Sequence, residues 1–97
     1  MAQFPSMKGR ELLRHLARKP LLYVEDPDRS RKGSHRTLVS PIFGEVLLGF
    51  HDRADVAPGM VRKVFTRDVG LSEEDAMKHL RGKLKEEDAS KYMRGSR

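Results

Sequence analysis

The chain contains no cysteine and no tryptophan, and its 97 residues include only four phenylalanines and two tyrosines. The lack of cysteine excludes disulfides and thiolate metal sites. Most of the aromatic residues lie in apolar segments and are expected in the core, which argues against a base-stacking platform for single-stranded nucleic acid. No apolar run approaches the roughly 20 residues that cross a bilayer, and the amino terminus lacks the apolar segment of a signal peptide. We therefore expect a soluble cytoplasmic protein with no membrane partner.

What the chain has in excess is positive charge. Lysine and arginine number 20 against 14 acidic residues, which gives a net charge of +6 and a pI near 10.0. Residues 1–72 carry 13 basic and 8 acidic side chains, a net +5, whereas residues 73–97 carry 7 and 6, a net +1. An excess of this kind favours a polyanionic partner such as nucleic acid. A basic protein that is merely well solvated is the plainer interpretation of the same charge.

The first predicted helix spans residues 7–19. Pro20 ends it, because the residue before a proline disfavours the helical region. The spacing of the apolar residues places them on one helical stripe. That stripe consists of Leu12, Leu13, Leu16 and Ala17. The basic residues Arg10, Arg14 and Arg18 repeat at every fourth position on another face, which is most simply exposed to solvent.

Three short strands follow in the pattern. Each is an apolar or alternating run too short for a helix and bounded by turn residues. They are predicted at residues 21–24, 35–40 and 45–50, with a turn over residues 41–44 between the last two.

The second half of the chain is predicted to be helical. Pro58 is suited to the first turn of a helix, and Gly70 is suited to its end. Ser72 and Asp75 have the spacing of a capping box at the start of a third helix over residues 72–84. Beyond Lys85 the chain is charged and shows no apolar periodicity, so we expect a frayed or disordered end.

This order of elements predicts an α+β fold of the α-β-β-β-α type. Short hairpin connections favour a three-stranded antiparallel sheet with both core helices on one face. The layout is that of a double-stranded-RNA-binding-like domain over residues 1–72. Residues 73–97 are expected to form a helical, partly disordered C-terminal extension.

Three segments, in order and at compatible spacing, resemble the HicA toxin family. They are residues 8–16 (KGRELLRHL), residues 32–36 (KGSHR) and residues 51–64 (HDRADVAPGMVRKV). The similarity covers about residues 7–72. Residues 73–97 extend beyond the usual family length, and the loop over residues 26–32 is longer and more charged than the usual hairpin.

The resemblance implies a ribosome-independent endoribonuclease that cleaves mRNA, the toxin of a type II toxin–antitoxin pair. Its partner would be an antitoxin of the HicB type that blocks the active site. The Gly-Ser-His motif implies His35 as the catalytic residue. No metal and no small-molecule cofactor is expected.

The residues around His35 suit this chemistry. RNA carries its own nucleophile, the 2′-hydroxyl, so an enzyme needs a group that moves a proton and groups that hold the phosphate. An imidazole titrates near pH 6.5 and is suited to general acid–base catalysis. The residues expected to bind the substrate are Arg31, Lys32, Gly33, Ser34 and Arg36.

Plainer interpretations stand beside these assignments. A lone histidine at the start of a strand is more often a surface residue than a catalyst, and loop arginines usually face water. Of the other histidines, His15 is expected on a helix surface and His79 in the dispensable tail. His51, at the end of the third strand, is a weaker candidate for supporting the site.

Two other functions remain open at this stage. A non-catalytic module with the double-stranded-RNA-binding-like layout could bind RNA without cutting it. A protein-interaction factor could use the basic face and the tail helix to bind an acidic partner.

Overall fold

The structure, a computed structural model, describes residues 3–28 and 35–95. Along the chain the elements are β1 (Met7–Lys8), α1 (Gly9–Ala17), β2 (Val24–Glu25), β3 (His35–Ser40), β4 (Gly44–Gly49), β5 (Asp55–Val56), α2 (Pro58–Lys63), the π-helical segment η1 (Val64–Asp68), α3 (Glu73–Leu80) and α4 (Glu86–Gly95). No helix in these ranges is long and apolar enough to span a membrane.

The predicted three-stranded antiparallel sheet is confirmed. Its order is β2-β3-β4, so β3 is the central strand, and it begins and ends at the predicted residues 35 and 40. One face of the sheet is buried, through Leu38, Val46 and Leu48. The other face leaves Leu47 68% exposed, because neighbouring residues of a strand point to opposite sides.

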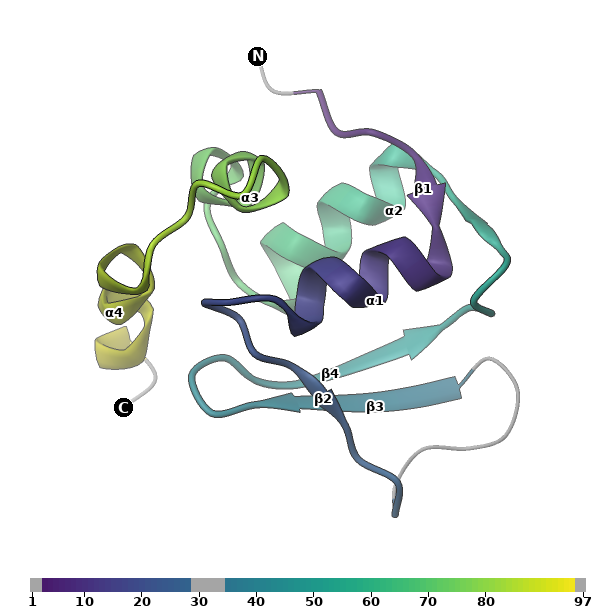
Figure 1. The fold of residues 1–97 in the computed structure, drawn as a ribbon, viewed down its shortest axis with the longest axis horizontal. Coiled ribbons are helices and arrows are strands. Elements are labelled where there is room, and N and C mark those ends of the chain that lie inside the picture. The colour runs from purple at the N-terminus through teal and green to yellow at the C-terminus, as the bar shows by residue number, and fades with distance from the viewer. Residues whose placement is uncertain (1–2, 29–34, 96–97) are drawn as a thin grey trace.

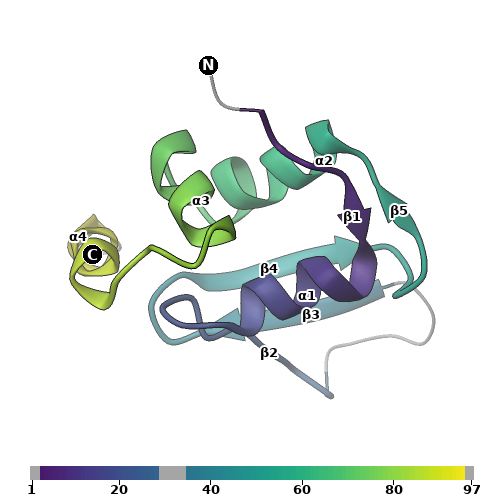
Figure 2. The same ribbon diagram turned by 45° about the horizontal axis from the view of Figure 1, so that its top comes forward.

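Both core helices cover the buried face of the sheet. Figures 1 and 2 show α1 and α2 lying over the same side of the strands, as the sequence predicts. The residues that meet between these layers include Leu12, Leu16, Leu38, Val46, Val61, Val64 and Phe65. The second helix passes into the π-helical segment η1 before it ends, and Gly70 follows with a φ of +95°, as expected for a stop.

The prediction of a strand over residues 21–24 is wrong, because β2 consists of Val24 and Glu25 alone. Leu21 and Tyr23 are buried, and the Tyr23 N–H donates to the Leu16 carbonyl at the end of α1 rather than to a strand. Within this part of the chain, the strand that pairs with β3 is β2, which consists of Val24 and Glu25. The apolar run therefore fills the core beside α1 instead of extending the sheet.

The third predicted helix is confirmed at its start. The Ser72 hydroxyl accepts a hydrogen bond from the Asp75 N–H at 3.1 Å, which is the predicted cap of α3.

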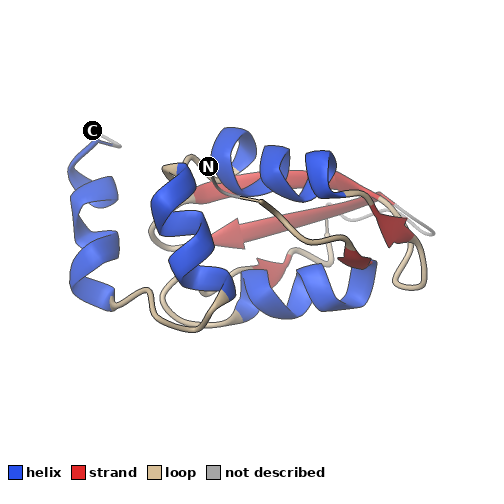
Figure 3. Cartoon of the chain, turned by 90° about the horizontal axis from the view of Figure 1, so that it is seen from above, coloured by secondary structure: helices blue, strands red, loops and turns tan. Residues whose placement is uncertain are grey.

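Helix α4 takes the place of the frayed end expected beyond Lys85, and it lies at one end of the molecule (Figure 3). Ala89 is fully buried, and the Tyr92 hydroxyl donates to the Asp75 carboxylate at 2.6 Å. The contact with Asp75 comes from α3, so the sequence of the segment alone did not indicate it. The boundary between residues 72 and 73 stays a prediction, and the core crosses it through Ala76 and Leu84.

Candidate active site

His35 is the first residue of the central strand, and its side chain is exposed. The residue opposite it on β4 is Gly49, where an added Cβ would meet nothing within 4 Å. No side chain from this partner position covers the imidazole. The backbone of His35 is held in the sheet by six residue pairs between β3 and β4. This arrangement gives a reactive group on a rigid element with open space beside it.

Arg36, the other predicted site residue that the structure describes, points to the opposite face of the strand. Its guanidinium forms an ion pair with the Asp52 carboxylate at 2.7 Å, and its side chain is 20% exposed. The two side chains therefore lie back to back rather than side by side. The remaining predicted site residues, Arg31, Lys32, Gly33 and Ser34, lie outside the described residues, so their grouping around His35 stays a prediction.

A polar hollow of about 560 Å³ adjoins Arg36. Arg36 is the second residue of β3, at the end of the sheet where β3 begins and β4 ends; Figure 1 shows this end of the two strands. The lining of the hollow consists of Arg36, His51, Asp52, Arg53 and Ala54. In the described part of the chain, neither the His51 ring nor the Arg53 guanidinium makes a hydrogen bond or ion pair. From the sequence, His51 is a weaker candidate than His35 for the site, and Arg53 is not predicted to belong to it. The available signals were the position of both directly after a predicted strand that pairs with the one carrying His35, and their place in the segment 51–64 that carries the family resemblance.

The first turn of α1 holds the backbone of this hollow. The Arg10 N–H donates to the Asp52 carbonyl and the Gly9 N–H to the Ala54 carbonyl, both at 2.9 Å. A Cβ at Gly9 would overlap the carbonyl oxygen of His51, so only glycine allows this close approach. The short pair of β1 and β5, which the sequence did not predict, ties the same two segments together.

The two histidines on the helices form a separate, structural cluster. His79 is 1% exposed, and its Nε2 bonds the carbonyl oxygen of His15, so the expected place of His79 in a dispensable tail is wrong. Burial lowers the pKa of His79 to about 4, and the positive charge of Arg18 acts in the same direction. His15 is half-buried with its Nδ1 against the Arg18 guanidinium, and burial followed by that charge lowers its pKa. Neither ring belongs to the His35 end of the sheet.

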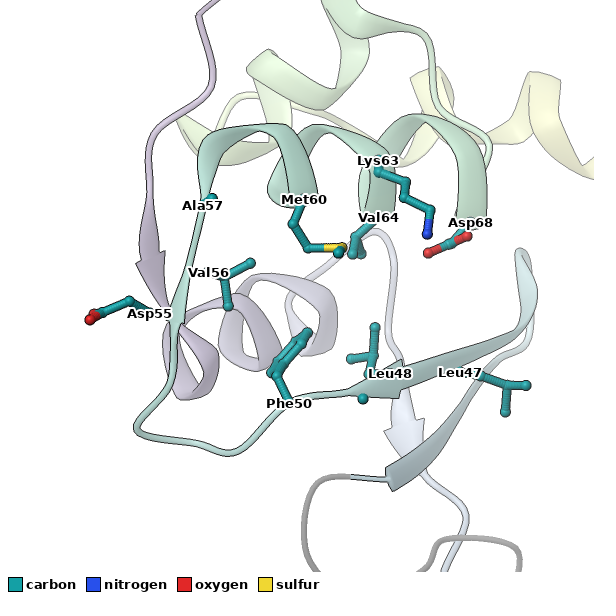
Figure 4. A pocket seen from close by; sticks show the side chains of 11 residues that line it. Leu47, Leu48, Phe50, Asp55, Val56, Ala57, Met60, Lys63, Val64 and Asp68 are labelled. Atoms are coloured by element: carbon teal, nitrogen blue, oxygen red, sulfur yellow. The ribbon is translucent and has the colours of Figure 1, made fainter.

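A second hollow, of about 450 Å³, lies between β4 and α2. Leu48, Phe50, Met60 and Val64 point into it, and Lys63 and Asp68 lie at its mouth (Figure 4). The lining is mostly apolar and contains no histidine and none of the predicted site residues. It offers an apolar side chain a place to pack.

Within residues 3–28 and 35–95, no cluster of three or more histidine or carboxylate side chains could hold a metal ion. The chain was also compared with known proteins. No family model, curated protein or solved structure matches it.

Proposed function

We propose that this protein is a metal-independent endoribonuclease that cleaves mRNA with His35 as general acid–base catalyst, the toxin of a HicA-type toxin–antitoxin pair. The observation that carries the proposal is the exposed imidazole at the start of the central strand, opposite a glycine. The net charge of +6 supports a polyanionic substrate. The α-β-β-β-α order supports a double-stranded-RNA-binding-like fold for residues 1–72.

The reaction needs few groups. The imidazole of His35 takes the proton of a ribose 2′-hydroxyl, whose oxygen then forms a bond to the adjacent phosphorus. The bond from phosphorus to the 5′-oxygen breaks, and that oxygen leaves with a proton from the medium or from an acid. The products are a 2′,3′-cyclic phosphate and a 5′-hydroxyl. Acid–base help of this kind contributes about 10²–10⁴ in rate.

A test compares the wild type with His35→Gln on unstructured RNA in the presence of EDTA. Glutamine keeps a polar side chain at this exposed position but cannot exchange a proton, so the fold and RNA binding are retained and cleavage is lost. Circular dichroism checks the fold, and gel analysis of labelled RNA checks cutting. Equal cleavage by both proteins would refute the role of His35. Binding by both and cutting by neither would favour a non-catalytic RNA-binding module.

The proposed protein partner is an antitoxin of the HicB type that covers His35. The outward face of the sheet supports this, because Val24 and Leu47 are 62% and 68% exposed and offer a partner apolar area beside the histidine strand. Induced expression of the chain alone is expected to arrest growth, and His35→Gln is expected to relieve the arrest. Arrest by both proteins would contradict an antitoxin that acts by blocking this residue.

A further inference from the structure

The polar hollow at the turn of residues 51–54 has the chemistry of an anion site. It contains two guanidinium groups and one carboxylate, which together leave one net positive charge. Lys8, which lies nearby, is already paired with Asp55 at 2.7 Å and adds no free charge. The cations that remain for a ligand are Arg36 and Arg53.

Of these two cations, Arg53 is the one whose side chain is free, within the described part of the chain, to bind a ligand. It is exposed and makes no ion pair among the described residues. Arg36 is engaged by Asp52 through one nitrogen, whereas a guanidinium has five N–H donors in a fixed fork. An incoming phosphate can therefore share or displace the Asp52 carboxylate, which is itself 51% exposed.

The hollow lies next to His35 along the backbone, because Arg36 lines it. Arg36 follows His35 directly, so their Cα atoms are about 3.8 Å apart. His51 lies two residues beyond Gly49, the cross-strand partner of His35. The side chains of His35 and Arg36 lie on opposite faces of the strand, so an RNA chain that presents one phosphate to His35 reaches the hollow by passing round the end of the strand, where the neighbouring phosphate enters it.

The backbone of the hollow is already in position before any ligand arrives. The carbonyls of Asp52 and Ala54 accept hydrogen bonds from the first two N–H groups of α1. The Ala54 N–H donates to the His51 carbonyl at 3.1 Å. A site held in this way loses little freedom on binding, which favours affinity.

We infer that this hollow is a second phosphate-binding subsite for RNA, in which Arg53 and Arg36 hold the phosphodiester next to the one that is cleaved and His51 adds a hydrogen-bond donor. The inference rests on the proposed function and adds Arg53 and His51 to the residues that contact the substrate. Asp52 acts as an internal counter-ion that keeps Arg36 in place when no RNA is bound.

The test uses a short fluorescein-labelled RNA in which every 2′-hydroxyl is methylated, so that it binds but has no nucleophile. Arg53→Ala is compared with Arg81→Ala, which removes the same charge from another exposed arginine far along the chain. Loss of a charge-assisted phosphate contact predicts about tenfold weaker binding for Arg53→Ala, and a salt slope about 0.7 smaller. Arg81→Ala is expected to leave both values close to the wild type.

A second pair of variants tests the counter-ion. Asp52→Asn removes the carboxylate that competes for Arg36 and is expected to bind the same RNA about threefold more tightly. Glu74→Gln, an exposed position on α3, makes the same change of charge and is expected to have a smaller effect. Equal affinities within each pair would overturn the subsite.

Cleavage of unmodified RNA is measured separately. If the wild type cuts RNA while Arg53→Ala binds and cuts like Arg81→Ala, the subsite is wrong and the proposed function stands. If the wild type does not cut but Arg53→Ala alone loses affinity, the proposed reaction is wrong and the phosphate site stands.

Discussion

Lowering the pH from 7 to 5 is expected to destabilise the folded chain through protonation of His79. This side chain is 1% exposed, and its ring packs at 6.0 Å between centroids from Phe65 and 6.3 Å from His15. In the neutral form Nε2 carries the proton and donates it to the His15 carbonyl. A second proton would place a charge in this packed region, close to the positive charge of Arg18.

The size of the effect follows from the two pKa values. The pKa of His79 is lowered to about 4 in the folded chain, first by burial, against an ordinary value of 6.5 in the unfolded chain. The unfolded state therefore binds the proton more tightly. Stability is fully present above about pH 6.5 and is lost as the pH falls toward 4. The full difference is about 3 kcal/mol, of which about 2 kcal/mol falls between pH 7 and pH 5.

Urea unfolding followed by circular dichroism at several pH values measures this loss. The control is His79→Gln, whose amide N–H can still donate to the His15 carbonyl but does not titrate. We expect the variant to lose about 2 kcal/mol less than the wild type between pH 7 and pH 5. Parallel pH profiles for the two proteins, or an NMR titration of the His79 ring near pH 6.5, would refute the reasoning.

Three further substitutions test the packing. Gly9→Ala places a methyl group against the carbonyl of His51 and is expected to lower the free energy of unfolding by about 2 kcal/mol. Its control, Gly59→Ala, adds a methyl group in open space on α2 and is expected to raise the free energy of unfolding slightly. Equal effects of the two substitutions in urea unfolding would contradict the close approach at Gly9. Tyr23→Phe removes a buried hydroxyl that has no hydrogen-bond partner in the described residues, and it is expected to raise the free energy of unfolding by about 1 kcal/mol; a loss would show that the hydroxyl is bonded. Tyr92→Phe removes the donor to the buried Asp75 carboxylate, and it is expected to cost about 1–2 kcal/mol and to speed proteolysis of α4; unchanged proteolysis would contradict the docking of that helix.

Local signals in the sequence identified the elements whose ends are set by local chemistry. The strand at residues 35–40 lies where a short apolar run between turn residues predicts it, and the cap at Ser72 and the stop at Gly70 lie where side-chain capping and a positive φ require them. The elements that the sequence did not predict correctly take their conformation from contacts with other segments of the chain. Leu21 and Tyr23 have strand composition, yet the end of α1 takes them into the core.

The C-terminal part shows the same division. The charged segment after Lys85 has no apolar period of its own, yet it is helical, with Ala89 buried and Tyr92 bonded to Asp75 of α3. The sequence places His79 in a dispensable tail, whereas its ring is buried and bonds the carbonyl of His15, which lies 64 residues earlier in the chain.

For the candidate site, the Gly-Ser-His motif was sufficient to select His35 but not to define its surroundings. The alternation of a strand already separates His35 from Arg36, and the structure shows where the guanidinium goes instead, to Asp52. The hollow could not be predicted, because it depends on the contact of α1 with a turn more than forty residues later in the chain.

The measurement that bears most directly on His35 uses two oligonucleotides that differ in one atom. Each is DNA with a single central position, which carries a 2′-hydroxyl in one and a hydrogen in the other. The wild type is expected to cut only the first, directly after the ribose, and to leave a 2′,3′-cyclic phosphate, while His35→Gln cuts neither. Cutting of both oligonucleotides, or of the first by His35→Gln at the wild-type rate, would contradict proton removal from ribose by this histidine.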